Sequence, residues 1–237
     1  MANLLKTENY IVAFIDVLGA KQLISQDMDG SLNTIHEAYD KSLELYKELF
    51  ERRVHFDFTI FSDNIVVARK VNNEKVFTAA FHAVHMMAAI IQGHFLFRNI
   101  LTRGGIAYGK YFADDTMVWG DALVKAHLLE ESIAIYPRVV IDPELVWKLN
   151  IFPKGPEKSQ YWLKQDQDGI LYVDYLKKKF IKNYDFILLQ ELARYDDRIA
   201  DAKDDTKVIQ KIIWHTNYIN CKLTEGDAVD EDETIEH

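Results

Sequence analysis

Apolar positions along the chain follow two different spacings, which predict strands and helices in a definite order. Residues 10–15 form a continuous apolar run that ends at Asp16, as in a buried strand. After Leu18-Gly19, apolar residues recur every three to four positions as far as Leu49. Asp29-Gly30-Ser31 interrupts this pattern, so we expect either one broken helix or two helices in succession.

From residue 54 the apolar spacing changes to two, which indicates a strand with one polar face. His55 and Asp57 lie on that polar face. Turn-forming residues follow before strand character resumes, so residues 54–70 are predicted to form a β-hairpin with Asp63 at or just after its tip.

The next segments repeat the alternation of helix and strand. We expect a helix capped by Asn72-Asn73-Glu74, a strand over 99–112, a helix from Trp119-Gly120 to Glu131 and a strand over 138–141. The resulting order β, α, β, β, α, β is typical of an α+β fold of the ferredoxin-like, split βαβ type.

Three regions are predicted along the chain. Residues 1–150 form the core, and residues 151–224 form a C-terminal extension packed on it, with a hairpin around Asp168-Gly169 and a long helix. Residues 225–237 contain seven acidic residues and are expected to be a solvated tail without fixed structure.

Composition and charge narrow the classes of function. The chain has 237 residues, 28 Lys and Arg against 37 Asp and Glu, and a net charge of −9, which disfavours nucleic acid or an anionic membrane as the main partner. Cys221 is the single cysteine and cannot form an internal disulfide. The polar start is unlike a signal peptide, so a cytoplasmic location is expected.

Two aspartates that are distant in sequence are predicted to converge. In a split βαβ fold the first and third strands are antiparallel neighbours, so Asp16 and Asp63 meet at one rim of the sheet. Each alone has an ordinary alternative, Asp16 as a helix cap and Asp63 as a turn residue. Together they suit two divalent cations, and amides at Leu18-Gly19 suit phosphate oxygens. This combination is typical of two-metal nucleotidyl transfer.

The strand over 99–112 is unusual because it carries three glycines, Gly104, Gly105 and Gly109. Glycines weaken a strand unless something approaches its backbone closely. We expect a ligand or a partner subunit to make that approach.

Four short motifs follow one another along residues 8–142. They are Phe14-Ile-Asp16-Val-Leu-Gly19, Phe61-Ser-Asp63-Asn64, Arg103-Gly-Gly-Ile-Ala-Tyr-Gly109, and Trp119-Gly120 followed by Ala126 and Leu129. Together they resemble the successive blocks of class III nucleotidyl cyclases. The resemblance is strongest to the short pyrimidine cyclases of Pycsar anti-phage systems, which make cyclic UMP or cyclic CMP.

The resemblance implies roles for these positions. Asp16, Asp63 and the carbonyl of Val17 match the ligands of two Mn²⁺ or Mg²⁺ ions, and Leu18 and Gly19 match the loop that holds the triphosphate. Such enzymes act as head-to-tail homodimers with their sites at the interface. In the Pycsar systems the cyclic nucleotide acts on a separate effector.

Two departures from the family pattern matter. Where adenylyl cyclases have an Asn and an Arg on the helix after the Trp-Gly block, this chain has Val124 and Leu128. Either the chain is catalytically degenerate and only binds a nucleotide, or another cation serves. Arg103 is our candidate, with Lys125 second, because phosphoryl transfer needs positive charge near phosphorus.

The base-reading positions also depart from both purine patterns, since they hold Asp57 and Met117. His55 and Asp57 are predicted either to read a smaller base or to be ordinary solvent-facing residues. The sequence therefore favours conversion of UTP to cyclic UMP, with CTP, transfer to a second nucleotide, and a non-catalytic binding module as alternatives.

Overall fold

The computed structural model describes residues 4–50, 55–151, 162–178, 181 and 183–229. The chain divides into two compact units, Met1–Tyr175 and Leu176–His237, which are considered separately below. The first unit contains a mixed β-sheet flanked by helices on both faces, and the second is helical where it is described.

The sheet has eight strands in the described part of the chain, and β5 is attached to the end of β4. The other seven follow the order β2-β3-β1-β4-β6-β8-β7, in which β4 and β6 run parallel and the remaining neighbours are antiparallel. The strands are β1 (Glu8–Val17), β2 (Asp57–Phe61), β3 (Asn64–Lys70), β4 (Thr102–Ala113), β5 (Val118–Trp119), β6 (Val139–Ile141), β7 (Leu163–Gln165) and β8 (Leu171–Val173). The predicted α+β class and the predicted antiparallel pairing of β1 with β3 are confirmed.

The predicted helix after β1 is two helices, α1 (Ala20–Gln26) and α2 (Met28–Phe50). The break lies at Asp27, before the glycine that predicted it. The Asp27 backbone is extended and its carboxylate accepts a hydrogen bond from the N–H of Gly30 at 3.0 Å. Asp27 therefore ends one helix and satisfies a free N–H of the next.

Helix α3 (Glu74–Leu96) is the core helix behind the sheet. Its cap is as predicted, because the Asn73 side chain accepts a hydrogen bond from the N–H of Val76 at 3.1 Å. By length and composition α3 alone among the described helices is apolar enough to cross a membrane. Most of its apolar stretch is buried inside the protein, as in the core helix of a globular domain.

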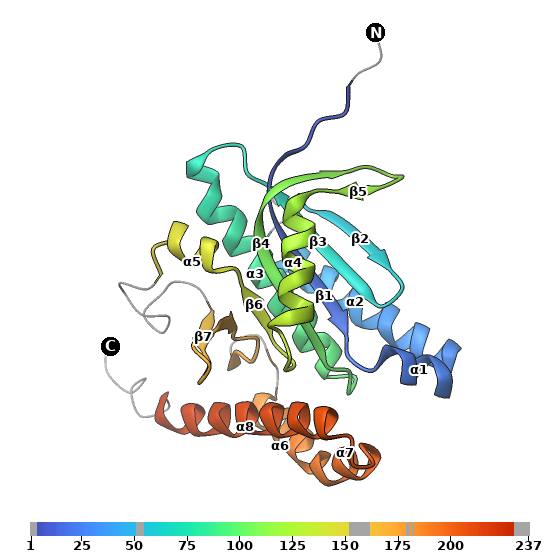
Figure 1. Cartoon of the computed structure of the whole chain (residues 1–237). Coiled ribbons are helices and arrows are strands. Elements are labelled where there is room, and N and C mark those ends of the chain that lie inside the picture. The colour runs from blue at the N-terminus through green and yellow to red at the C-terminus, as the bar shows by residue number, and fades with distance from the viewer. Residues whose placement is uncertain (1–3, 51–54, 152–161, 179–180, 182, 230–237) are drawn as a thin grey trace. The chain divides into compact units, whose positions relative to one another are not determined.

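Helix α4 (Asp121–Ser132) lies across the opposite face, in front of β1 and β4 in Figure 1. Its approach is close because two of the three glycines of β4, Gly105 and Gly109, face it. A Cβ on Gly105 would lie 2.4 Å from the carbonyl oxygen of Ala126, and one on Gly109 would lie 2.8 Å from the Asp121 carboxylate. These glycines make room for α4 of the same chain, which corrects the expectation of an approaching ligand or partner subunit.

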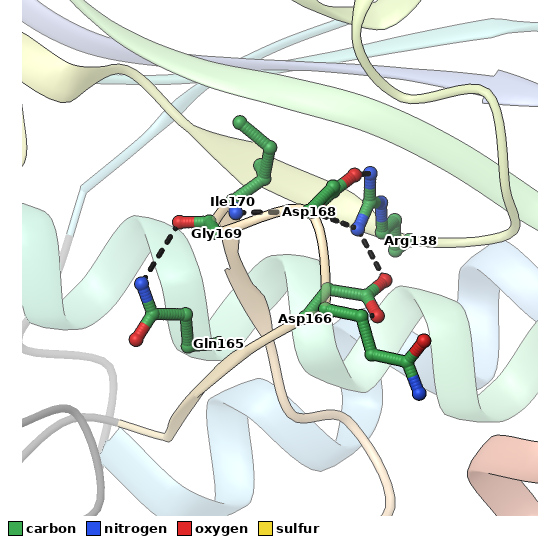
Figure 2. Close-up of polar contacts among 7 residues, drawn as sticks. Arg138, Gln165, Asp166, Asp168, Gly169 and Ile170 are labelled. Carbon is green, nitrogen blue, oxygen red and sulfur yellow. Dashed lines mark hydrogen bonds and ion pairs between the residues drawn. The ribbon is translucent and has the colours of Figure 1, made fainter.

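The hairpin β7–β8 continues the first unit's sheet past residue 150, and a buried arginine fastens its tip. Arg138, just before β6, is 1% exposed and forms ion pairs with Asp166 and Asp168 (Figure 2). The Arg138 Nη2 lies 2.5 Å from Asp168 Oδ2. Burial opposes ionisation of Asp168, but hydrogen bonds from Arg138 and from the Ile170 N–H outweigh it and lower its pKa.

Helix α5 (Pro143–Lys148) follows β6, and the second unit holds α6 (Tyr184–Ala193), α7 (Tyr195–Asp201) and α8 (Thr206–Val229). The single long helix predicted there is thus three helices. The chain turns at Lys203 and Asp204, both of which have positive φ. Helix α8 extends into the predicted acidic tail as far as Val229, and residues 230–237 lie outside the described residues.

Candidate active site

One row of side chains crosses the sheet where β1 ends, and it contains the predicted catalytic residues. Phe61 pairs with Asn64, Asn64 pairs with Asp16, and Asp16 pairs with Arg103. Directly paired residues of antiparallel strands project from the same face. That face is the one covered by α4, since the neighbouring positions on β1, Val12 and Phe14, pack in one cluster with Ala122 and Ala126.

Asp63 joins this row through the backbone. It lies in the turn between β2 and β3, and its carbonyl accepts a hydrogen bond from the N–H of Val17 at 3.1 Å. Its carboxylate Oδ1 accepts a hydrogen bond from the Asn64 side-chain amide at 3.2 Å. The turn and the register thus bring Asp63 beside the residue that follows Asp16, as the topology predicted.

Arg103 lies between two acidic groups. Its Nε is 3.3 Å from Asp16 Oδ2, and its Nη2 is 2.5 Å from Oε1 of Glu130 on α4. Glu130 was not identified from the sequence, where two adjacent acids near the end of an amphipathic helix, Glu130 and Glu131, give no signal of a site. Burial raises the pKa of Glu130, while the Arg103 guanidinium acts in the opposite direction.

The last residue of β1 and the two residues that follow it are the three predicted backbone contributors. Val17 is buried and pairs with Thr102. The N–H of Leu18 donates to the carbonyl of Leu101 at 2.9 Å, so this amide already has a partner within the chain. Gly19 is exposed with φ of 77°, a left-handed conformation that favours glycine. Its carbonyl accepts the first hydrogen bonds of α1, from the N–H groups of Gln22 and Leu23.

Asp57, one of the two predicted base-reading residues, lies farther along the same face. Asp57 pairs with Ala68, four residues along β3 from Asn64, which corresponds to about 13 Å at about 3.3 Å per residue. The Tyr10 hydroxyl, which sequence reasoning did not single out, lies near the Asp57 carboxylate. Burial, together with the Asp57 charge, raises the pKa of Tyr10 to about 12, so this phenol stays protonated and able to donate.

The other predicted positions lie at the surface. His55 is exposed in the segment before β2 and has no place in the strand pairing. On the outer side of α4, Val124 and Leu128 are 56% and 50% exposed. Lys125 is held by Glu144, with 3.3 Å between its Nζ and Oε2, and its Nζ also donates to the Tyr108 carbonyl. These contacts place Lys125 away from the row that contains Arg103.

The acidic groups suit a divalent cation that is shared with a phosphate. Within the described ranges, no cluster of three or more His, Cys, Asp or Glu side chains has the geometry of a self-contained metal site. Mg²⁺ at phosphate sites is commonly held by one or two carboxylates, with waters and substrate oxygens completing the shell. Asp16 and Asp63, adjacent through Val17, match that smaller donor set.

Comparisons with known proteins give the following result. No family model matches the chain, and no curated protein matches it. Solved structures similar to it include the monomeric guanylyl cyclase domain of a RhoGC fusion protein from the aquatic fungus Blastocladiella emersonii, at 15% identity over 71% of this chain and 96% of that chain, with a TM-score of 0.49.

Two further similar structures come from Pseudomonas aeruginosa. The adenylyl cyclase CyaB is 16% identical over 61% of this chain and 82% of its own, with a TM-score of 0.43. A class III adenylyl cyclase-like ATP-binding protein is 9% identical over 60% of this chain and 35% of its own, also with a TM-score of 0.43. At these identities and TM-scores, the likeness by itself says nothing of what this chain binds.

Proposed function

We propose that this chain is a metal-dependent nucleotidyl cyclase of the class III type that converts UTP to 3′,5′-cyclic UMP and pyrophosphate. The observation that carries the proposal is the row formed by Asp16 and Arg103, with Asp63 beside it, on the α4 face of the sheet. It brings two carboxylates and a guanidinium from three separate segments to one partly exposed place. The motif resemblance described above supports the same assignment.

The reaction is an internal displacement. The 3′ oxygen of the ribose bonds to the α-phosphorus, the bond from that phosphorus to the bridging oxygen breaks, pyrophosphate leaves, and the hydroxyl proton is released to solvent or a base. Asp16 and Asp63 would hold the two Mn²⁺ or Mg²⁺ ions, which supply charge neutralisation and lower the pKa of the attacking hydroxyl. Arg103 would bind the oxygens that gain negative charge around the α-phosphorus.

A pyrimidine is the proposed base. Asp57 is an acceptor, and the nearby Tyr10 stays protonated. By the resemblance, Asp57 and Met117 stand at the positions where purine cyclases carry different base-reading residues. A carboxylate accepts equally well from the N3–H of uracil or the amino group of cytosine, so CTP stays as the alternative. Gly19, whose backbone is exposed, is the proposed contact to the triphosphate, whereas the Leu18 amide is already bonded to Leu101 and His55 lies outside β2, so these two predicted contacts are the weaker ones.

A homodimer is proposed because the outer surface of α4 is apolar where the family has polar residues. Val124 and Leu128 are one helical turn apart and both at least half exposed, so a second copy covering α4 would bury them. Val124→Asp combined with Leu128→Asp should shift the protein to monomers in sedimentation velocity. An unchanged sedimentation coefficient would place the dimer contact elsewhere.

The direct test incubates the purified protein separately with UTP, CTP, ATP and GTP plus Mn²⁺ and measures pyrophosphate and product mass. Cyclic UMP from UTP supports the proposal, and cyclic CMP alone would reassign the base. Asp63→Ala should abolish product with little effect on the urea midpoint, while Asp115→Ala, an exposed aspartate on the β4–β5 loop, should behave as wild type. Normal turnover by Asp63→Ala would refute the metal assignment.

A non-catalytic nucleotide-binding module is the second candidate, favoured by the exposed Val124 and Leu128 in place of the family's Asn and Arg. Binding of a triphosphate in calorimetry without release of pyrophosphate from any of the four would establish it.

The proposed biological role is defence against phage, in which the cyclic nucleotide diffuses to a separate effector. This part rests on the resemblance to Pycsar cyclases. Co-expression with a candidate effector should protect cells from phage only when the cyclase retains Asp63, and protection by Asp63→Ala would exclude a diffusible product.

A further inference from the structure

Glu130 is a buried acid that contacts Arg103 through both its side chain and its backbone carbonyl. Its side chain is 4% exposed, and its Oε1 lies 2.5 Å from Arg103 Nη2. The backbone carbonyl of Glu130 also accepts a bond from Arg103 Nη1 at 3.5 Å. The guanidinium is therefore held from one side by a single residue of α4, while its Nε faces Asp16 on β1.

Packing alone does not account for an acid at this position. Burying a carboxylate is costly, and replacing a buried ion pair by apolar side chains is often neutral or stabilising. The helix already packs on β4 through its small and apolar residues, since Ala126 and Leu129 fit against Gly105. The contact of α4 with the sheet therefore does not itself require the Glu130–Arg103 pair.

In the proposed function, the carboxylate of Asp16 has two partners, Arg103 and a metal ion. Its Oδ2 faces Arg103 Nε at 3.3 Å, and the same carboxylate is the proposed ligand of a cation. When Asp16 takes a metal ion, the arginine loses part of its hold on β1. The two contacts to Glu130 do not involve Asp16 and are unaffected by that exchange.

We propose that Glu130 is a positioning residue that keeps the Arg103 guanidinium beside Asp16 when Asp16 changes partner. Helix α4 then contributes to the site by positioning the guanidinium of Arg103, which belongs to β4. Its own residues Val124 and Leu128 carry no positive charge. This inference rests on the proposed function for the role of Arg103, and it adds a residue that neither the motifs nor the resemblance indicated.

The test compares Glu130→Gln with Glu131→Gln, the exposed acid next to it on α4. For a residue that orients a catalytic group, we expect Glu130→Gln to lower kcat by about 10- to 100-fold with KM for UTP little changed. Arg103→Ala should lower kcat at least as much, and the double variant should be no worse than Arg103→Ala, because the two residues act as a unit. Glu131→Gln should match wild type.

A second readout does not depend on turnover. Mn²⁺ alone is titrated into nucleotide-free protein in a calorimeter, where Arg103 competes with the ion for Asp16. Arg103→Ala should bind Mn²⁺ more tightly, because the competing guanidinium is gone. Glu130→Gln should bind Mn²⁺ about 10-fold more weakly, because the Arg103 guanidinium, no longer paired with Glu130, pairs more strongly with Asp16. Urea midpoints confirm that each variant is folded.

The outcomes separate this inference from the proposed function. If wild type forms no cyclic product from any triphosphate, the proposed function fails, while the Mn²⁺ titration still decides the coupling of Glu130 to Arg103. If Glu130→Gln equals Glu131→Gln in both kcat and Mn²⁺ affinity, Glu130 has no positioning role. Should Glu130→Gln unfold, the double variant Glu130→Met with Arg103→Met tests whether the pair is needed for folding, and a folded, normally active double variant overturns the inference.

Discussion

Two arginines at the starts of neighbouring parallel strands, Arg103 on β4 and Arg138 before β6, each lie between two carboxylates, yet they differ in exposure. Arg138 is 1% exposed, and both of its partners come from one hairpin tip. Arg103 is 22% exposed, and its partners Asp16 and Glu130 come from a strand and a helix. Ion pairing alone therefore does not mark a site. Convergence of separate elements with access to solvent is what distinguishes the candidate active site from a structural clamp.

The largest loss of stability is expected when the ion pairs of Arg138 with the β7–β8 hairpin are removed. Arg138→Ala leaves Asp166 and Asp168 without their buried partner and should lower the free energy of unfolding by about 3–5 kcal/mol. Arg103→Ala should cost less stability, because water reaches the partly exposed Asp16, and the buried Glu130, whose pKa burial raises, can take up a proton once its partner is gone. Urea denaturation of both variants measures the contrast, and equal losses would remove the distinction between clamp and site.

Low pH should destabilise the protein through a second buried contact, which lies next to the β7–β8 hairpin. His85 on α3 is fully buried, with Nδ1 donating to the Phe81 carbonyl and Nε2 accepting the backbone N–H of Trp162, which precedes β7. Burial lowers the pKa of His85 to about 3 from 6.5. Between these values the unfolded chain binds a proton that the folded chain does not, so stability falls as pH is lowered through this window.

The slope for this one group is up to about 1.4 kcal/mol per pH unit and vanishes above about pH 6.5. Carboxylates and His215, whose pKa burial also lowers to about 3, add their own dependence. The check is therefore a difference: the pH profile of wild type minus that of His85→Gln should slope between pH 4 and 6 by up to this amount. Parallel profiles would contradict a buried, neutral His85.

A smaller loss of stability should follow from a substitution that displaces α4 from β4, beside the candidate active site. Gly105→Ala sets a Cβ 2.5 Å from Leu129 Cβ and 2.4 Å from the Ala126 carbonyl oxygen, so α4 must shift, at a cost of about 1–3 kcal/mol. Because Glu130 moves with α4, activity should fall as well. Gly93→Ala in α3 is the matched control, with nothing within 4 Å of the new Cβ, and should gain about 0.5–1 kcal/mol. Loss of stability in both variants would point to a general intolerance of alanine.

The smallest effect tests a feature remote from both arginines. Asn73→Ala removes the cap of α3 and should cost about 1 kcal/mol in thermal or urea unfolding without changing turnover. Asn72→Ala is its control, since the α3 cap bond is made by the neighbouring Asn73. A drop in kcat for Asn73→Ala would show that the core helix communicates with the site.

How far the sequence predicts this protein depends on the range of the interaction. Most strand positions, the turn at Asp63 and the cap at Asn73 follow from local spacing and turn chemistry, and they agree with the structure. The exception is the strand predicted from residue 54, because β2 begins at Asp57 and leaves His55 outside it. The helix boundaries were less accurate: the break lies at Asp27, and one predicted C-terminal helix is three. Asp27 and the turn at Lys203 depend on backbone conformations that apolar periodicity does not report.

What the sequence determined by itself is the order of the elements and, through it, the meeting of β1 with the turn that holds Asp63. Strand alternation and antiparallel pairing fix that meeting without any knowledge of packing. The tertiary structure alone decided which charges pair. The guanidinium of Arg103 meets Glu130, and that of Arg138 meets the hairpin, only because helix rotation and strand register orient side chains from separate elements. Spacing along one segment cannot encode these contacts, since each depends on the placement of another segment.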